Sequence, residues 1–136
     1  MKELRILQVE DNEGDIILTV EALKEANVKH IISVAMDGQE ALDLLRKTEE
    51  LPDLILLDIN LPKIDGIEVL SIIKKEERLM HIPVIILSTS STEKDILSAY
   101  NNFATSFITK PLDLNKFLGV LESIGTFSND IQDNVA

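Results

Sequence analysis

Short aliphatic runs alternate along the chain with longer stretches in which apolar residues recur every three or four positions. The short runs show little polar alternation, which is typical of β-strands buried on both faces. The longer stretches have the periodicity of amphipathic helices, as where Leu42 and Leu45 lie opposite Asp43 and Arg46. The pattern predicts strands over residues 5–9, 31–35, 53–57, 83–87 and 106–109, and helices over residues 14–27, 37–50, 65–78, 92–102 and 113–125.

Polar residues mark the starts of four of these helices. Asp37 and Asp65 each precede a glycine at the beginning of a helical pattern. Ser90 stands three residues before Glu93, which is the spacing of a capping box, and Asp113 can cap the fifth helix. These residues predict where the helices begin.

Strict alternation of strands and helices predicts an α/β fold. Helices on both faces of a five-stranded parallel sheet give a doubly wound architecture. We expect residues 1–125 to form this single domain, because the chain has the length of one ordinary domain. Residues 126–136 lose the periodicity and are expected to be a frayed, disordered tail.

Composition excludes several classes of function. The 136 residues include 13 basic and 24 acidic side chains, giving a net charge of -11, which disfavours direct contact with nucleic acid or an anionic membrane. The absence of cysteine removes disulfides and thiolate metal sites. The first residues lack the apolar core of a secretory signal. We therefore expect a cytoplasmic protein.

Chemically active side chains follow the predicted strands. In a parallel sheet the carboxyl ends of the strands meet at one edge, where ligands bind. Residues far apart in sequence should therefore converge there. They are Glu10 and Asp11 after the first strand, Asp58 after the third, Ser88 and Thr89 after the fourth, and Thr109, Lys110 and Pro111 after the fifth.

Three neighbouring carboxylates repel one another unless a cation neutralises them. An all-oxygen set without histidine or cysteine suits Mg²⁺ better than zinc. Magnesium beside a lysine and a hydroxyl suggests a phosphoryl group, and Asp58 is then the candidate nucleophile that would form an aspartyl phosphate.

Each residue also has a simpler interpretation. Glu10 or Asp11 could be a solvated loop acid or the cap of the first helix, and Lys110 could be a surface lysine lying over apolar atoms. Ser88 could be an ordinary hydroxyl at a strand end, and Phe107 could be plain core. Convergence at one sheet edge favours the phosphoryl site.

Four motifs in order resemble the receiver domain of two-component response regulators, the family typified by the chemotaxis regulator CheY. They are "LQVEDN", "LILLDINLPKIDG", "PVIILSTS" and "SFITKP", and the match covers about residues 4–125. The resemblance implies a flavodoxin-like (βα)5 fold with strand order 2-1-3-4-5. The stretches "LSTSS" and "SAYNNFATSFITKP" are similar to small receivers that partner bacterial phytochrome-type kinases.

The resemblance implies a role for each acid. Asp58 would accept a phosphoryl group from the phosphohistidine of a histidine kinase. Asp11 and Asp58 would bind Mg²⁺ directly, Glu10 would act through metal-bound water, and Asn60 would supply its backbone carbonyl. Residues matching Asn60 and Ser90 influence the lifetime of the phosphoryl group in this family.

The resemblance also implies a switch. Lys110 would pair with the phosphoryl oxygens, and the Lys110-Pro111 peptide bond would be cis. The Ser88 hydroxyl would move to bond a phosphoryl oxygen, and Phe107 would change rotamer with it. These movements would remodel an output face formed by the fourth helix, fifth strand and fifth helix.

Four positions depart from the common family pattern. Ser88 replaces threonine, Thr89 replaces a smaller residue and could narrow access to Asp58, and Phe107 replaces tyrosine. Phe103 stands where glycine often ends the fourth helix in a left-handed conformation, so we expect a turn there that is either strained or differently shaped.

The sequence therefore predicts a single-domain response regulator that is not an enzyme beyond its own phosphorylation and dephosphorylation. The expected partners are a histidine kinase and either a downstream protein or a histidine phosphotransfer domain. A homodimer through the output face is also expected.

Two alternatives remain open. A degenerate receiver could act as a constitutive interaction module, although the complete acid set argues against it. A phosphatase-like hydrolase could use the same nucleophile, but such enzymes place a second acid two residues later, where this chain has Asn60.

Overall fold

The computed structural model, which describes residues 3–89 and 92–123, has the predicted α/β architecture. Its five strands form one parallel sheet in the order β2-β1-β3-β4-β5, so the predicted fold class and strand order are confirmed. The strands are β1 (Leu4–Val9), β2 (His30–Ala35), β3 (Leu54–Asp58), β4 (Val84–Ser88) and β5 (Ser106–Thr109). The helices are α1 (Glu13–Glu25), α2 (Gly38–Lys47), α3 (Gly66–Lys75), α4 (Glu93–Asn101) and α5 (Leu114–Ser123).

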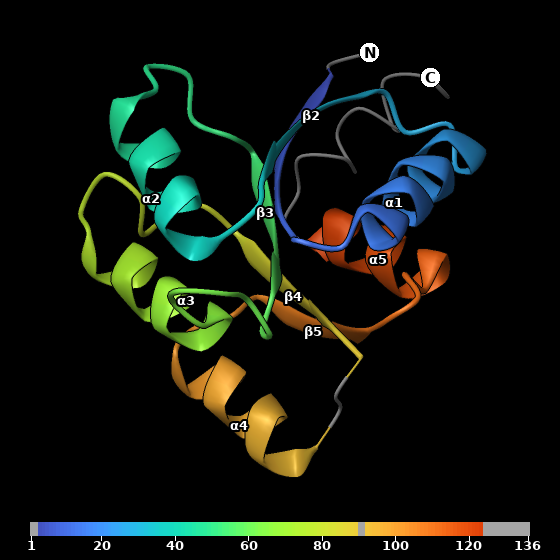
Figure 1. Ribbon diagram of the computed structural model, residues 1–136. Helices are drawn as coiled ribbons and strands as arrows, with labels where there is room; N and C mark the ends of the chain where they lie inside the picture. Colours follow the sequence, from blue (N-terminus) through green and yellow to red (C-terminus); the bar gives the residue numbers. More distant parts are fainter. Residues whose placement is uncertain (1–2, 90–91, 124–136) are drawn as a thin grey trace.

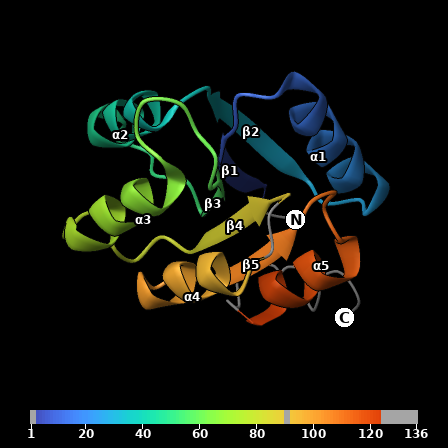
Figure 2. The same cartoon turned by 60° about the horizontal axis from the view of Figure 1, so that its bottom comes forward.

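Helices cover both faces of the sheet (Figure 1). Helices α1 and α5 lie on one face and α2, α3 and α4 on the other, as the turned view also shows (Figure 2). Each face has its own buried apolar cluster, one around Phe117 of α5 and Leu23 of α1, the other around Leu45 of α2 and Leu70 of α3. Strand β3 is central and buried at every position, which explains its uninterrupted aliphatic sequence.

Side-chain caps fix the beginning of every helix. Asn12, rather than Glu10 or Asp11, caps α1 by accepting from the backbone N–H of Asp15, while Asp37 and Asp65 cap α2 and α3 as predicted. Asp113 accepts from the backbone N–H of Lys116 in α5. The capping role predicted for Ser90 is wrong, because Thr92 caps α4 by accepting from the backbone N–H of Asp95. Ser90 itself lies outside the described residues.

Three helices end earlier than the apolar pattern predicts. Helix α2 stops at Lys47 and α3 at Lys75, because Thr48 and Glu76 adopt extended backbone conformations. Helix α1 stops at Glu25, and Asn27 then takes a left-handed conformation with φ 58°.

Phe103 follows α4 in the left-handed conformation that the sequence predicts, with φ 68°. Its side chain is 75% exposed, so burial of the ring does not compensate for the backbone strain. The turn therefore keeps the geometry that glycine usually supplies.

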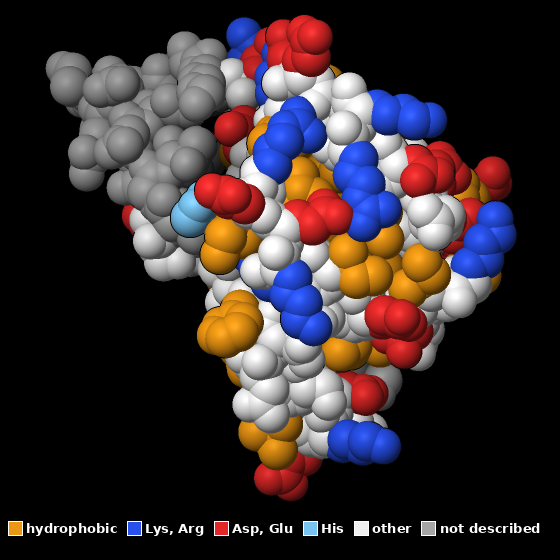
Figure 3. All heavy atoms as spheres, turned by 90° about the vertical axis from the view of Figure 1, so that its left-hand side faces the viewer, with side chains coloured by type: hydrophobic (Ala, Val, Ile, Leu, Met, Phe, Trp, Pro, Cys, Tyr) orange, Lys and Arg blue, Asp and Glu red, His pale blue; other side chains and the backbone are white. Residues whose placement is uncertain are grey.

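Both termini of the sequence extend beyond the described part. Residues 126–136, predicted to be a frayed tail, lie outside it. Among the described helices, none is long and apolar enough to cross a bilayer. On the face that carries α2 and α3, acidic and basic side chains lie interspersed with hydrophobic ones (Figure 3).

Candidate functional site

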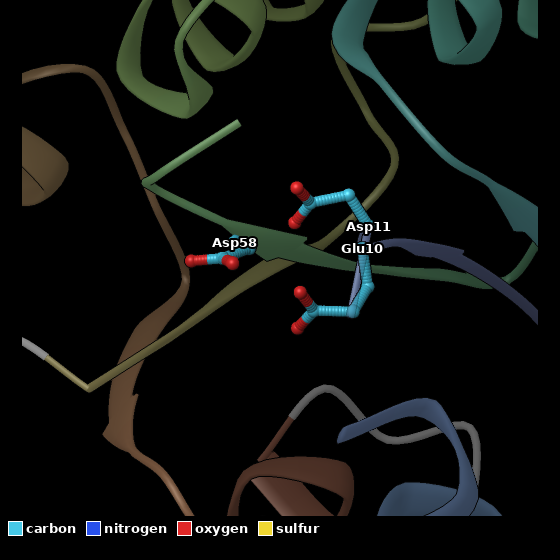
Figure 4. Close-up of side chains that lie close together, drawn as sticks. All are labelled: Glu10, Asp11 and Asp58. Atoms are coloured by element: carbon cyan, nitrogen blue, oxygen red, sulfur yellow. The ribbon is translucent and has the colours of Figure 1, made fainter. Parts of the chain in front are cut away.

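Three carboxylates meet at the carboxyl edge of the sheet, as the sequence predicts. Asp58 is the last residue of β3, and Glu10 and Asp11 directly follow β1. The register that pairs Val9 with Leu57 places the two strand ends side by side. One carboxylate oxygen from each of the three residues lies within 4.8 Å of the others, and the close-up shows the carboxylates directed toward a common space (Figure 4).

The three acids differ in their contact with solvent. Glu10 is 1% exposed and Asp58 is 6% exposed, whereas Asp11 lies on the surface. This combination puts two buried acids beneath one accessible acid. Oxygen ligands from three carboxylates suit a hard divalent cation such as Mg²⁺, so the residues present fit the predicted metal.

Lys110 reaches these acids from the loop after β5. Its Nζ donates to Asp58 Oδ2 at 3.2 Å and to Glu10 Oε1 at 2.5 Å. A third bond, 2.9 Å long, goes to Asp15 Oδ2 in the first turn of α1. Only 9% of the lysine side chain is exposed, so it is a buried ion-pair partner and not a surface lysine.

Asp15 is the site residue that the sequence analysis missed. It lies four positions after Asp11, in the first turn of the helix that begins at the sheet edge. That position was the available signal, because the amino end of a helix following a parallel strand also lies at this edge.

The pKa values of Glu10 and Lys110 both lie above their ordinary values, but for different reasons. Burial raises the pKa of the Glu10 carboxyl from 4.5 to about 7; the bond from Lys110 opposes this rise and the neighbouring Asp58 adds to it. Burial lowers the pKa of Lys110, but the bonds to Glu10 and Asp15 outweigh it and the pKa ends above its ordinary value. The ammonium is therefore a permanent charge in this cluster.

The loop between β3 and α3 stays close to Asp58. The backbone N–H of Asn60 donates to Asp58 Oδ1 at 3.1 Å, which fixes one carboxylate oxygen. Gly66 packs directly on the strand end, since a Cβ placed there would lie 2.1 Å from the backbone oxygen of Asp58. The local sequence thus needs glycine at this position.

The ends of β4 and β5 bring the predicted hydroxyl and lysine to the same edge. Ser88 pairs in register with Thr109, and its carbonyl accepts from the backbone N–H of Lys110 at 2.8 Å. Ser88 is buried and Thr89 is exposed. The predicted cis bond between Lys110 and Pro111 is confirmed.

Phe107 lies in the core beneath this edge. Its ring is 4% exposed, and its backbone N–H donates to the phenolic oxygen of Tyr100 in α4 at 3.2 Å. The fifth strand is therefore bonded directly to the exposed side of α4.

An open cleft of about 700 Å³ borders Asp11 on the side of α4. Asp11 and Asn60 line its inner end, and Lys94, Asp95 and Ser98 of α4 line the far wall. A molecule approaching Asp11 can use this opening.

Comparison with known proteins identifies the family to which these features belong. The family model described as "Response regulator receiver domain" matches residues 6–122. The response regulator Rcp1 of Synechocystis sp. is 38% identical over 127 residues, which cover 90% of this chain and 86% of that protein.

Solved structures of similar proteins have the same fold. The bacteriophytochrome response regulator AtBRR is 38% identical with a TM-score of 0.81, covering 92% of this chain and 94% of that one. The phosphorylated cyanobacterial phytochrome response regulator RcpA is 42% identical with a TM-score of 0.76, covering 93% and 94%. An Mn²⁺-bound form of Rcp1 is 36% identical with a TM-score of 0.74, covering 91% and 93%.

Proposed function

The chain belongs to the response regulator receiver domain family, and we propose that Asp58 is the phosphoacceptor through which it is switched. The observation that carries this proposal is the position of the Asp58 carboxylate. It stands at the end of the central strand, 3.2 Å from the Lys110 ammonium and within 4.8 Å of the Glu10 and Asp11 oxygens. A nucleophile in this setting has both a cation site and a fixed positive charge beside it.

In the proposed reaction, an Asp58 oxygen attacks the phosphorus of a kinase phosphohistidine. The new O–P bond forms as the N–P bond breaks, and the imidazole nitrogen keeps the electron pair and takes a proton from water. Asn60 holds the other Asp58 oxygen through its backbone N–H at 3.1 Å, which orients the nucleophile.

The cation proposed for this site is Mg²⁺, held directly by Asp11 and Asp58, with Glu10 acting through bound water and Asn60 through its backbone carbonyl. When bound, Mg²⁺ supplies positive charge that neutralises the transferring phosphoryl group. The oxygen-only acid cluster supports this assignment, as does the Mn²⁺-bound form of Rcp1.

Lys110 and Ser88 are proposed to hold the phosphoryl oxygens once they are in place. Movement of the Ser88 hydroxyl would then allow Phe107 to change rotamer, and the bond between Phe107 and Tyr100 supports a path to α4. Lifetime control of the phosphoryl group is proposed for Asn60 and for Ser90, which lies outside the described residues.

The output surface is proposed to be the face of α4, β5 and α5. Leu97 and Tyr100 of α4 are 54% and 46% exposed, and such large apolar side chains suit a protein partner. The partner would be a downstream protein, a histidine phosphotransfer domain or a second copy of the chain. Similarity to phytochrome response regulators supports a phytochrome-type histidine kinase as the phosphodonor, in the cytoplasm.

Phosphorylation by a small donor tests the proposal without the kinase. Acetyl phosphate with Mg²⁺ should add one phosphoryl group to the wild-type protein, and Asp58→Asn should add none by intact mass spectrometry. Wild-type levels of labelling in Asp58→Asn would reject the assignment. Failure of the wild type to bind a beryllium fluoride mimic with Mg²⁺ would favour the constitutive interaction module, and sustained turnover of an external phosphoester would favour the hydrolase.

A further inference from the structure

We propose that Asp15 is a positioning residue for Lys110, because its carboxylate on α1 contacts the ammonium beside the acids and so aims that ammonium at Asp58. The inference rests on the proposed function of Asp58. It assigns the first turn of α1 a part in the reaction, although Asp15 neither binds the metal nor touches the phosphoryl group.

The three donors of the Lys110 ammonium have three carboxylate partners. The bond to Glu10 is 2.5 Å long, the bond to Asp15 is 2.9 Å and the bond to Asp58 is 3.2 Å. A lysine ammonium has three N–H groups and no others, so every donor is committed. The weakest of the three bonds, judged by length, is the one to the proposed phosphoacceptor.

The backbone of Asp15 is anchored on both sides. Its N–H donates to Asn12 Oδ1 at 3.0 Å, and its carbonyl accepts from Thr19 Oγ1 at 3.0 Å. Thr19 in turn accepts from Nε2 of Gln8 in β1, at 3.1 Å and buried from solvent. This chain of hydrogen bonds joins the first turn of α1 to β1, the strand that Glu10 directly follows.

Phosphorylation should change only one of the three lysine contacts. An acyl phosphate removes the negative charge of the Asp58 carboxylate and places phosphoryl oxygens in front of it. The donor that faced Asp58 can then bond to a phosphoryl oxygen while Glu10 and Asp15 keep the ammonium in place. Without the negative charge of Asp15 this contact weakens, and the ammonium can turn away from Asp58.

Glu13 offers a matched control. It is an acid in the same first turn of α1, it is exposed, and it makes no hydrogen bond or ion pair with Lys110 in the described part of the chain. Glu13→Gln therefore removes the same charge from the same helix end without touching the lysine.

The experiment measures the rate of phosphorylation by acetyl phosphate at saturating Mg²⁺ in five proteins. They are the wild type, Asp15→Asn, Glu13→Gln, Lys110→Ala and the double variant Asp15→Asn/Lys110→Ala. We expect Asp15→Asn to be roughly tenfold slower, the effect of one lost charge-assisted hydrogen bond, and Glu13→Gln to match the wild type. The double variant should react at the rate of Lys110→Ala alone, because Asp15 acts through the lysine.

A fifth variant, Asp15→Glu, separates positioning from a structural effect. It keeps a carboxylate within reach of Lys110 and should recover part of the phosphorylation rate that Asp15→Asn loses. If Asp15 served only to fold the helix, Asp15→Glu would not recover the rate. Equal urea midpoints for Asp15→Asn and Glu13→Gln would show that both are folded.

The outcomes separate this inference from the function on which it rests. A wild-type protein that gains no phosphoryl group at Asp58 overturns both. A wild type that is labelled normally, with Asp15→Asn as fast as Glu13→Gln, overturns the positioning role alone. Multiplicative losses in the double variant also overturn it, because Asp15 would then act independently of Lys110.

Discussion

The buried carboxyl of Glu10 makes the stability of the metal-free protein depend on pH. Its pKa rises from 4.5 to about 7 on folding, chiefly because of burial. The folded state therefore holds this proton more tightly than the unfolded state. The contribution to stability is complete below pH 4.5 and is lost as pH rises through about 7.

The size of the effect follows from the same shift. One pKa unit corresponds to about 1.4 kcal/mol, and the window from pH 5 to pH 8 begins above the ordinary value of 4.5, so only part of the full shift appears within it. We expect the free energy of unfolding in EDTA to fall by about 2 kcal/mol between pH 5 and pH 8 through this group.

Urea denaturation at several pH values, compared between the wild type and Glu10→Gln, isolates the contribution. Glutamine has the shape of the protonated acid and does not titrate, so the variant should match the wild type near pH 5 and exceed it in stability at pH 8. Saturating Mg²⁺ should instead stabilise the wild type more as pH rises, because the cation binds ionised carboxylates. The same pH dependence in both proteins would refute the reasoning.

Three further substitutions test other parts of the account. Phe103→Gly should raise the free energy of unfolding by about 0.5–1 kcal/mol in urea titrations, because glycine adopts the left-handed backbone conformation without strain. Phe103→Ala should not raise it, and equal effects of the two substitutions would contradict the strain. Gly66→Ala should lower the free energy of unfolding by on the order of 3 kcal/mol, because the new Cβ would meet backbone atoms of Asp58 and Ile59. The control Gly119→Ala, which has open space around the new Cβ, should be neutral or stabilising. Lys110→Ala should still accept phosphate slowly but lose phosphorylation-dependent partner binding in pull-down assays, and unchanged binding would contradict its role as the charge contact.

The position of the site at one edge of the sheet could be predicted, because the residues that form it directly follow the strands in the sequence. Four of the five strands end at or directly before a polar residue, and the carboxyl ends of parallel strands all lie at the same edge. The sequence alone therefore predicted that four side chains lie close together at this edge, those of Glu10, Asp11, Asp58 and Lys110. The family resemblance added the order of the strands and the cis peptide bond between Lys110 and Pro111. Hydrophobic periodicity indicates neither of them.

Features that depend on how helices dock could not be predicted in this way. The contact between Asp15 and Lys110 requires the first turn of α1 to dock at the sheet edge, where hydrogen bonds of Gln8 and Thr19 join that turn to β1. The capping residue of α4 was assigned wrongly because three hydroxyl residues in a row, Ser90 to Thr92, can each cap a helix, and only the packed structure selects Thr92. The difference in burial between Glu10 and Asp11 likewise follows from which side of the strand end each one occupies.

Asp58 is proposed to carry the phosphoryl group, and borohydride trapping identifies the residue that carries it. Borohydride reduces an aspartyl phosphate to homoserine, so peptide mass spectrometry after reaction with acetyl phosphate and Mg²⁺ identifies the residue that carried it. We expect homoserine at position 58 and unmodified Glu10, Asp11 and Asp15. Conversion at any of those three acids, or at none of the four, would contradict it.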